Sequence, residues 1–276
     1  MSVELPAWLA DLRHREIVSR VNDDPRSDGG NLLGYDPNTA FNQILEGGQA
    51  DFDAPLGDLS ADDRALLYAY LLQKGHLEEL TAAFRMLFPD KARISAPIVV
   101  DLGCGPFTGG LALAAALGIE AKFDYIGMDQ SAAMRQLGER LALASPLQGV
   151  EHQWCRSLPA TIWTEPPRWR PVIVIASYLL KSPNLNAAEL VSTLLNLLKK
   201  IGRGPVTVLY TNAYGEQPNQ KFPAFRDALL NAGFSPNVDA EGTIKIERHT
   251  EIRIRRLRYA LFHRPKQNRM SLGKRT

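Results

Sequence analysis

The sequence of 276 residues has no apolar run of the roughly 18 to 20 residues that a membrane-spanning helix needs. Its first residues, MSVELPAWLADLRHRE, carry early acids and no uninterrupted apolar core, so they predict no signal peptide. Only two cysteines occur, Cys104 and Cys155, which are too few for a disulfide scaffold. We therefore expect a protein without membrane contact in a reducing, cytoplasmic setting.

Metal-ligand spacing and low-complexity sequence are also missing. The five histidines are scattered and none has the spacing of a zinc site, so we expect no metal. Cys155 has only His152 and Arg156 near it in sequence, which favours a structural role over a nucleophilic one. With 45% hydrophobic and 22% charged residues, the chain is typical of a globular protein with one large domain and an appendage.

Residues 96–263 alternate short β-branched or apolar runs with helical patterns, which is typical of βαβ units and a mostly parallel sheet. The fold class is therefore α/β, with helices on both faces of a seven-stranded sheet. The expected strands are 98–101, 125–128, 150–154, 172–176, 206–210, 243–246 and 252–262. The expected helices are 108–117, 131–144, 187–201 and 223–231. In the last strand the apolar phase shifts across Arg255 and Arg256, which predicts a bulge there.

Residues 1–95 contain no strand pattern and are predicted to form a helical appendage. A first helix is expected near 5–21, followed by a polar loop over 22–38. Ser60 and Asp63 have the spacing of a capping box for a second helix, which is expected to bend near Gly75 and to resume to Phe88.

The segment VVDLGCGPFTGG, residues 99–110, ends a strand with an acid, turns on two glycines and starts a helix. Gly103 and Gly105 let backbone amides approach a ligand, and the helix beginning at Thr108 offers free N–H groups and a positive dipole end. Asp101 is placed to face a cationic amine. A second segment, YIGMDQS, places Asp129 at the end of the next strand, where a carboxylate can accept both ribose hydroxyls.

The combination DLGCG and GMD resembles the first two motifs of the class I S-adenosylmethionine (SAM)-dependent methyltransferases, over about residues 95–263. The resemblance implies a Rossmann-like methyltransferase sheet, SAM as cofactor and S-adenosylhomocysteine (SAH) as product. It further implies that Asp101 and the backbone of Gly103, Cys104 and Gly105 hold the methionine end. Asp129 would bind the ribose, and Gln130 and Ser131 would flank the adenine.

The sequence departs from the family pattern in two places. The family often has a glycine where Phe107 stands, so we expect the loop to follow a somewhat different path. After the third strand the family often has a polar or acidic residue for adenine, where this chain has Trp154 followed by Cys155; Trp154 is a candidate for stacking on the base. A nicotinamide site and a turn without a ligand remain alternatives, although Thr108 replaces the third glycine of the nicotinamide fingerprint.

The run 172–176 is expected to deliver Ser177, Tyr178 and Lys181 beside the transferable methyl, and these are the candidate catalytic residues. The alternative is that Tyr178 packs under the appendage and Lys181 is solvated. The ASYL sequence lacks the NPPY or DPPY pattern of amino-methylating nucleic-acid enzymes. The predicted function is methyl transfer to an N or O acceptor in RNA, protein or a small molecule, with residues 1–95 as a lid.

Residues 244–276 hold eleven Lys or Arg and two Glu, which gives this end a net charge of +9. Because the whole chain has a net charge of +2, the remaining residues have a net charge of −7. Two interpretations stay open for this basic end, in which 264–276 is expected to be a tail. It binds RNA phosphates, or it is a solvated sheet edge with a solubilising extension. Accordingly, the alternative to an enzyme is a non-catalytic SAM- or SAH-binding module in RNA or ribonucleoprotein assembly.

Overall fold

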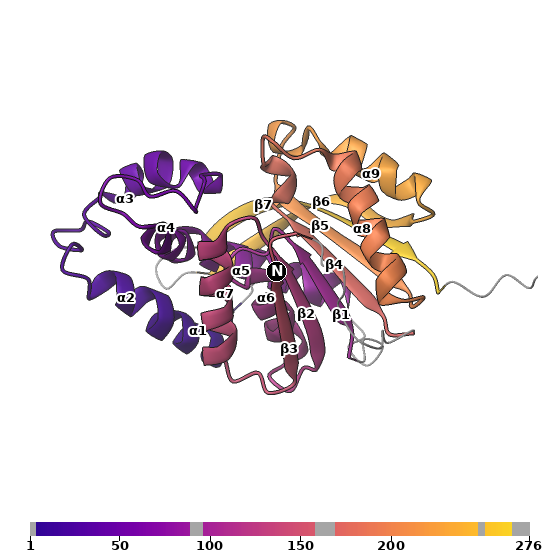
Figure 1. Cartoon of the computed structure of the whole chain (residues 1–276), viewed down its shortest axis with the longest axis horizontal. Coiled ribbons are helices and arrows are strands. Elements are labelled where there is room, and N and C mark those ends of the chain that lie inside the picture. The colour runs from indigo at the N-terminus through magenta and orange to yellow at the C-terminus, as the bar shows by residue number, and fades with distance from the viewer. Residues whose placement is uncertain (1–3, 89–95, 158–168, 248–251, 267–276) are drawn as a thin grey trace, which may run out of the picture.

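The computed structural model describes residues 4–88, 96–157, 169–247 and 252–266. These residues form a seven-stranded sheet in the order β3-β2-β1-β4-β5-β7-β6 (Figure 1). The strands are β1 (Ile98–Leu102), β2 (Phe123–Met128), β3 (Val150–Cys155), β4 (Val172–Ser177), β5 (Val206–Ala213), β6 (Ser235–Glu247) and β7 (Ile252–Arg264). The first five are parallel, and β7 runs antiparallel to β5 and β6. The predicted α/β class with a mostly parallel sheet is confirmed.

Helices cover both faces of the sheet. Apolar residues of α6 (Thr108–Leu117) and α7 (Ala132–Ala144) share a core with one face, on which Val99, Ile173 and Ile175 lie. Those of α8 (Ala187–Ile201) and α9 (Phe222–Asn231) share a core with the opposite face. The central strands β1 and β4 are buried along nearly their whole length, as continuous apolar runs predict.

Residues 4–88, which we call the N-terminal unit, are helical as predicted. Helical turns run without a break over α1 (Ala7–Arg13), a π-turn (His14–Val18) and α2 (Ser19–Asn22). A second continuous helix comprises α4 (Ala61–Tyr68), a π-turn (Ala69–Gln73) and α5 (Lys74–Leu87). Its capping box of Ser60 and Asp63 is present, and the expected bend corresponds to the π-turn just before Gly75.

A third helical stretch, α3 (Pro37–Thr39) with the π-turn Ala40–Ile44, was not predicted, although Asp36 caps it and Pro37 starts it.

The N-terminal unit packs on α6 rather than standing apart. Thr81 Oγ1 donates to the carbonyl of Ala112 at 3.5 Å, and Arg85 Nη2 donates to that of Ala115 at 3.3 Å. Leu77, Leu80 and other residues of the unit belong to the same apolar core as α6. Because α6 lies between the sheet and α5, it is buried on all sides. In the described part of the chain no helix has the length and apolar character of a membrane span.

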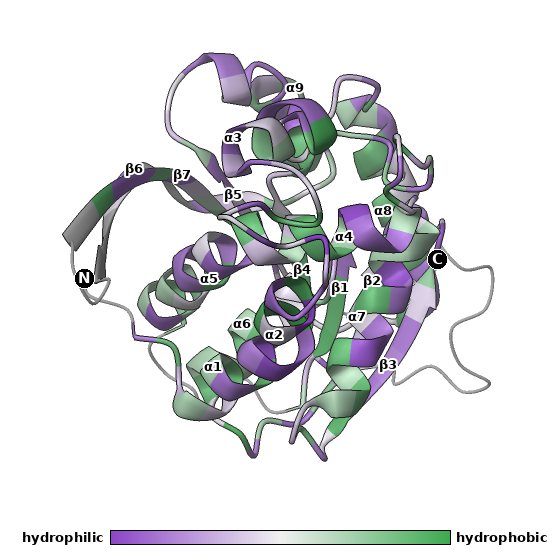
Figure 2. Ribbon diagram, turned by 90° about the vertical axis from the view of Figure 1, so that its left-hand side faces the viewer, coloured by the Kyte–Doolittle hydropathy of each residue, from purple (hydrophilic) through white to green (hydrophobic). Residues whose placement is uncertain are grey.

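Two sequence expectations about the C-terminal hairpin are wrong. The register irregularity lies between Pro236 and Val238, and the ladder is regular through Arg255 and Arg256. The apolar phase changes there because the surroundings change: Ile254 is 67% exposed, whereas Leu257 is buried. Figure 2 shows this end of the hairpin projecting past its neighbours.

The expected tail also begins later than residue 264. Arg264 belongs to β7, where it pairs with Val206, and its guanidinium lies 4.8 Å from the Phe234 ring centroid. Residues 267–276 lie outside the described residues.

Candidate functional site

The predicted site lies where the strand order reverses. From β1 the chain continues outward through β2 and β3, whereas β4, on the other side of β1, leads to β5 and β7. In open α/β sheets the loops that leave two such strands diverge, and a crevice opens at their carboxyl ends. The glycine-rich segment after β1 and the segment after β4 both lie at this edge.

The glycine-rich turn has the backbone conformation that the sequence suggests. Gly103 has φ of 68° and Gly105 has φ of 50°, both in the left-handed region that glycine favours. The amide of Cys104 donates to the carbonyl of Met128 at 2.8 Å, which ties the turn to the end of β2. The turn leads directly into α6.

Asp101 is the last residue but one of β1, beneath this turn, and is 3% exposed. Its Oδ2 accepts a hydrogen bond from the Tyr125 hydroxyl at 2.7 Å, and a side chain at Gly109 would collide with the same oxygen. Burial raises the pKa of Asp101 to about 7, even though the Tyr125 hydrogen bond acts in the opposite direction. No cation within the described residues forms an ion pair with this carboxyl group.

Asp129 connects the two motifs. Its Oδ2 accepts from the backbone N–H of Gly105 at 3.0 Å, and its Oδ1 accepts from that of Ser131 at 2.9 Å. Burial raises the pKa of Asp129, against the lowering effect of these two bonds. Each carboxylate oxygen keeps a lone pair for a further donor. The side chain is thus fixed between the glycine-rich turn and the start of α7.

Other predicted cofactor residues lie around this pair. Thr108 Oγ1 is buried and has no hydrogen-bond partner among the described residues. Ser131 caps α7 by accepting from the amide of Met134 at 3.1 Å. Gln130 is exposed, and its carbonyl accepts from Arg135.

Trp154 lies in the core under α7. Its ring centroid is 5.6 Å from that of Phe107 and 5.4 Å from that of Tyr125, and a Cβ at Gly138 would lie 2.9 Å from it. The structure therefore groups Trp154 with the aromatic residues below the turn. Its role at adenine stays a prediction.

Phe107, which replaces the family's frequent glycine, adopts φ of 63° and ψ of 23°. This is the left-handed conformation that a glycine takes without strain. The fully buried ring packs edge-on against Tyr125, with centroids 4.7 Å apart. Aromatic packing therefore holds a non-glycine residue in a glycine-like backbone conformation. The different loop path that the replacement suggested stays a prediction.

The three candidate catalytic residues follow β4. Ser177 Oγ accepts from Thr211 Oγ1 at 2.9 Å. Tyr178 has φ of 57°, its amide donates to the Thr211 carbonyl, and its hydroxyl donates to Glu79 Oε2 at 2.7 Å. Lys181 is exposed at the end of a short 3-10 turn, Leu179–Lys181. The structure brings Ser177 to the glycine-rich turn, packs Tyr178 under α5 of the N-terminal unit and leaves Lys181 at the surface, as the alternative interpretation expected for the last two.

Residues of the N-terminal unit that sequence reasoning missed complete the site. Tyr68 and His76 line a cavity of about 20 Å³ together with predicted site residues, namely Asp101, Gly103, Cys104, Gly105, Thr108 and Ser177. At the neighbouring end of the site, Asp53 Oδ1 accepts from Ser131 Oγ at 2.8 Å and from the amides of Ala132 and Ala133. No local sequence motif predicts these contacts, because the partners are far apart in sequence.

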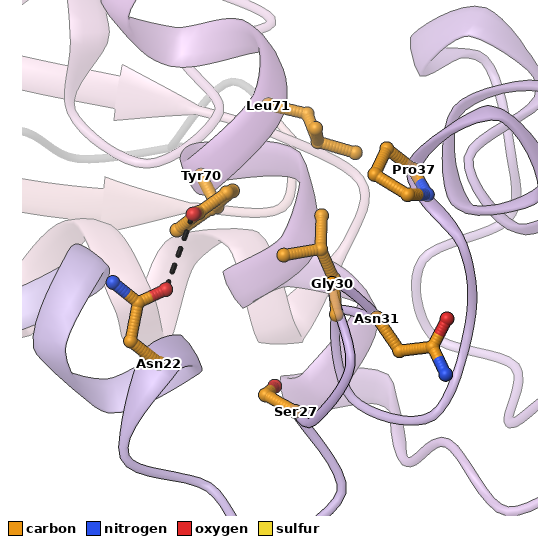
Figure 3. A pocket seen from close by; sticks show the side chains of 8 residues that line it. Asn22, Ser27, Gly30, Asn31, Pro37, Tyr70 and Leu71 are labelled. Carbon is orange, nitrogen blue, oxygen red and sulfur yellow. Dashed lines mark hydrogen bonds between the residues drawn. The ribbon is translucent and has the colours of Figure 1, made fainter.

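A larger hollow of about 390 Å³ lies elsewhere, within the N-terminal unit (Figure 3). The hydroxyl of Tyr70 donates to Asn22 Oδ1 at its edge, at 3.1 Å, and Ser27, Asn31 and Leu71 also line it. None of the motif residues reaches this hollow, so we assign it no part in the site.

The order and direction of the strands decide the fold class. Five strands run parallel in the order β3-β2-β1-β4-β5. The antiparallel β7 lies beside β5, and β6 lies beyond β7. This is the sheet topology of the class I SAM-dependent methyltransferases. The chain has this fold.

Solved structures that match the chain include many methyltransferases with this fold. One is the magnesium protoporphyrin IX methyltransferase of Synechocystis with bound SAH, at 16% identity and a TM-score of 0.45, covering 81% of this chain and 96% of that one. Another is a precorrin-6y C5,15-methyltransferase of Geobacter metallireducens, at 11% identity and a TM-score of 0.45, covering 68% and 88%. A third, a putative RNA methyltransferase of Pyrococcus horikoshii, has 16% identity and a TM-score of 0.42, covering 69% and 85%. No protein-family model and no curated protein matches the sequence.

Proposed function

We propose that the protein is a SAM-dependent methyltransferase that acts on an N or O acceptor. One observation carries the proposal: Asp101 and Asp129 enclose the Gly103–Gly105 turn at the switch point of the sheet, where ligands of this fold class bind. SAM, when bound, supplies the methyl group on a sulfonium.

The polar groups of the site fit such a molecule. Asp101 is a buried carboxyl group without a cationic partner in the described chain, which suits an α-amino group. Thr108 Oγ1 is a buried hydroxyl without a partner at the start of α6, where the helix dipole favours a carboxylate. Asp129 keeps lone pairs for two ribose hydroxyls.

The space between these groups is smaller than the cofactor. Sites for molecules of this size occupy roughly 300 to 1,000 Å³, whereas the cavity measures about 20 Å³. A Cβ at Gly105 would lie 3.9 Å from the Tyr68 ring, so the N-terminal unit rests directly on the turn. In our proposal this unit is a lid that moves away when the cofactor enters and then closes over it, which returns Tyr68 and His76 to the site.

Two contacts hold the proposed lid at the two motifs. Gln73 Nε2 donates to the Pro106 carbonyl in the glycine-rich segment at 2.8 Å. Asp53 accepts from the first amides of α7, next to Asp129. A lid attached to both motif loops couples its own movement to cofactor binding.

Calorimetric titration with SAM and SAH tests the cofactor assignment. Transfer of labelled methyl from SAM to separated RNA, protein and metabolite fractions then tests the activity. We expect binding of both compounds and transfer to one fraction. Binding without transfer to any fraction would favour the non-catalytic SAH- or SAM-binding module, and no binding would overturn the proposal.

A further inference from the structure

His76 is a half-buried group at the site that the proposed function does not yet use. It lies on α5, and its imidazole stacks on the ring of Tyr178 with centroids 4.1 Å apart and an interplanar angle of 26°. Over the described residues, its one hydrogen-bonding neighbour is the Tyr68 hydroxyl, 3.4 Å from Nδ1. His76 lines the cavity beside Asp101 and Ser177, and its Nε2 has no hydrogen-bond partner among the described residues.

The surroundings of His76 fix its ring in place. Tyr178, on which it stacks, has a left-handed backbone conformation, which is strained for a residue other than glycine. Its hydroxyl donates to Glu79 Oε2 at 2.7 Å, and Arg255 Nη1 donates to Glu79 Oε1 at 3.1 Å. Glu79 lies three residues after His76 on the same helix. The chain of contacts from Arg255 through Glu79 to Tyr178 thus positions the imidazole.

His76 is neutral at pH 7. Burial lowers its pKa to about 4, and the positive charges of Arg255 and Lys181 act in the same direction. The other titratable groups close to it are Tyr68 and Tyr178, both of which burial keeps un-ionised by raising their pKa. In the tautomer with Nδ1–H directed at the Tyr68 oxygen, Nε2 is an unprotonated acceptor.

The same cavity contains a hydrogen-bond donor. The Ser177 oxygen accepts the proton of the Thr211 hydroxyl at 2.9 Å, so the proton of Ser177 itself is free to point elsewhere. The cavity therefore offers one acceptor, His76 Nε2, and one donor, Ser177 Oγ–H.

We infer that His76 is the proton acceptor of the methyl-acceptor site, and that this site takes a hydroxyl group. The inference rests on the proposed function. The substrate oxygen accepts from Ser177 with one lone pair and forms the new O–C bond with the other. The C–S electron pair stays on sulfur, and the hydroxyl proton passes to His76 Nε2. A neutral amine has a single lone pair, which a hydrogen bond from Ser177 would block.

A weak base suffices for this step. As the O–C bond forms, the oxygen gains positive charge and its proton becomes strongly acidic, so that even an imidazole of low pKa accepts it. The imidazole must also be unprotonated before the reaction, and His76 is unprotonated throughout the neutral range.

Three probes that differ only in the nucleophile test the substrate class: phenol, aniline and thiophenol, each with SAM labelled in the methyl group. We expect transfer to phenol. In His76→Gln we expect transfer to fall by about 100-fold or more, the usual contribution of a general base, while SAH affinity changes less than about threefold. His14→Gln is the matched control, because His14 is exposed on the first helix.

Nitrogen NMR of the histidine side chains gives a readout that does not depend on turnover. In the SAH-loaded protein we expect phenol to shift the His76 Nε2 signal and to leave that of His14 unchanged. Undiminished phenol methylation by folded His76→Gln would overturn the role of His76 but not the hydroxyl substrate class. Transfer to aniline or thiophenol but not to phenol would overturn the hydroxyl class. Failure of SAH to bind at all would instead remove the proposed function, and this inference with it.

Discussion

Asp101 combines deep burial with the absence of a cationic partner in the described chain, and this makes its ionisation depend on the ligand. Its pKa of about 7 means that the carboxyl group is partly protonated at neutral pH. An α-amino cation pairs with the ionised form. We expect SAH affinity to fall as the pH is lowered through 7, approaching tenfold per unit below it, and binding near pH 7 to release a proton.

Calorimetry at several pH values, in two buffers with different heats of ionisation, measures both effects. Asp101→Asn should bind SAH weakly with no pH dependence between pH 5.5 and 8. The stability of the free protein depends on pH in the opposite direction to this affinity. Between the unfolded pKa near 3.8 and about 7 the folded state holds a proton that the unfolded state has lost, so stability decreases as pH rises across this window. A pH-independent affinity in the wild type would contradict the assignment of Asp101.

Asp129 links the two motifs and, in the proposed function, also accepts the ribose hydroxyls. In Asp129→Ala the amides of Gly105 and Ser131 lose their acceptor, and the ribose hydroxyls lose theirs. We expect SAH binding to weaken by about 1.5 to 3 kcal/mol, or roughly 10- to 150-fold. Asp124→Ala is the control, because Asp124 lies at the opposite end of β2 and pairs with Arg170 away from the site. Equal affinity in folded Asp129→Ala and in the control would disprove the ribose site.

Among the elements, the turn before α6 carries a strained residue at Phe107. Removal of its buried ring in Phe107→Ala should lower the free energy of unfolding by about 3 to 5 kcal/mol. Glycine takes the left-handed conformation without strain, so Phe107→Gly should be more stable than Phe107→Ala by about 1 kcal/mol. Urea unfolding of the three proteins measures this order. The opposite order, with alanine more stable, would show that the backbone at this position is not left-handed.

The loop that contains Asp53 is the element that closes the site at α7. Arg64 supports it by donating to the carbonyls of Ile44, Asp51 and Ala54. Burial raises the pKa of Asp53, but hydrogen bonds from Ser131 and from the α7 amides outweigh it, so the pKa lies below the ordinary value. The contact is therefore ionised at neutral pH, where a carboxylate at a helix start is stabilising.

If this contact holds the lid closed, Asp53→Ala should favour the open form and increase both the association rate and the affinity of SAH. A capping contact at an exposed position contributes about 1 kcal/mol, so we expect a gain of about fivefold. Stopped-flow mixing with SAH measures the rate, and Asp58→Ala, an exposed change nearby without a helix contact, is the control. A slower association in Asp53→Ala than in this control would argue that Asp53 helps to build the site instead.

Local signals predicted some elements closely and left others unpredicted. The bounds of α6 and α8 were predicted to the residue, because Gly118 and Gly202 end them and Asn186 caps α8. The start of β6 was missed by eight residues, since its first half lacks an apolar pattern and takes its structure from pairing with β7. Asp101 and Asp129 belong to local sequence motifs and were therefore predicted. Tyr68, His76 and Asp53 reach the site only through tertiary packing, which no local pattern indicates.

For the whole molecule, the N-terminal unit and the sheet domain are not separable. Their apolar residues form one core, and α6 packs against both. A truncation at residue 95 would leave the outer surface of α6 bare. The lid is therefore better studied by single substitutions in the intact chain than by deletion.

The charge of the whole molecule is concentrated at its C-terminal end, but several of those cations have partners within the protein. Arg255 pairs with Glu79, Arg258 with Glu241, and Arg256 lies over the Tyr214 ring. Lys266 lies 4.3 Å from the Trp169 ring centroid. RNA binding by this end stays a prediction, and residues 267–276, with Arg269, Lys274 and Arg275, are the part to test.

Deletion of residues 267–276 leaves β7 complete, so SAH affinity should be retained. If the three cations contact phosphates, RNA affinity should fall, and the slope of log K against log salt should become shallower by about 0.7 to 0.9 per lost contact. Titration of both proteins with single-stranded and structured RNA at several salt concentrations measures the slopes. Identical slopes, or no binding by either protein, would leave the basic end as a solvated extension.

The position of β7 between β5 and β6 also governs how the chain is made. Until residue 264 has been synthesised, β6 has no strand partner and β5 lacks its second neighbour, whereas α5, which ends at Leu87, is complete 177 residues earlier. At about 5 to 20 residues per second, this interval is roughly 10 to 35 seconds. During this interval the sheet against which the early helices pack is incomplete. Pairing between strands that are far apart in sequence, such as β5 with β7, is also slow to form. The nascent chain therefore carries unpaired strand edges and exposed apolar surface until its last strand is made, and we expect it to be prone to aggregation during this interval.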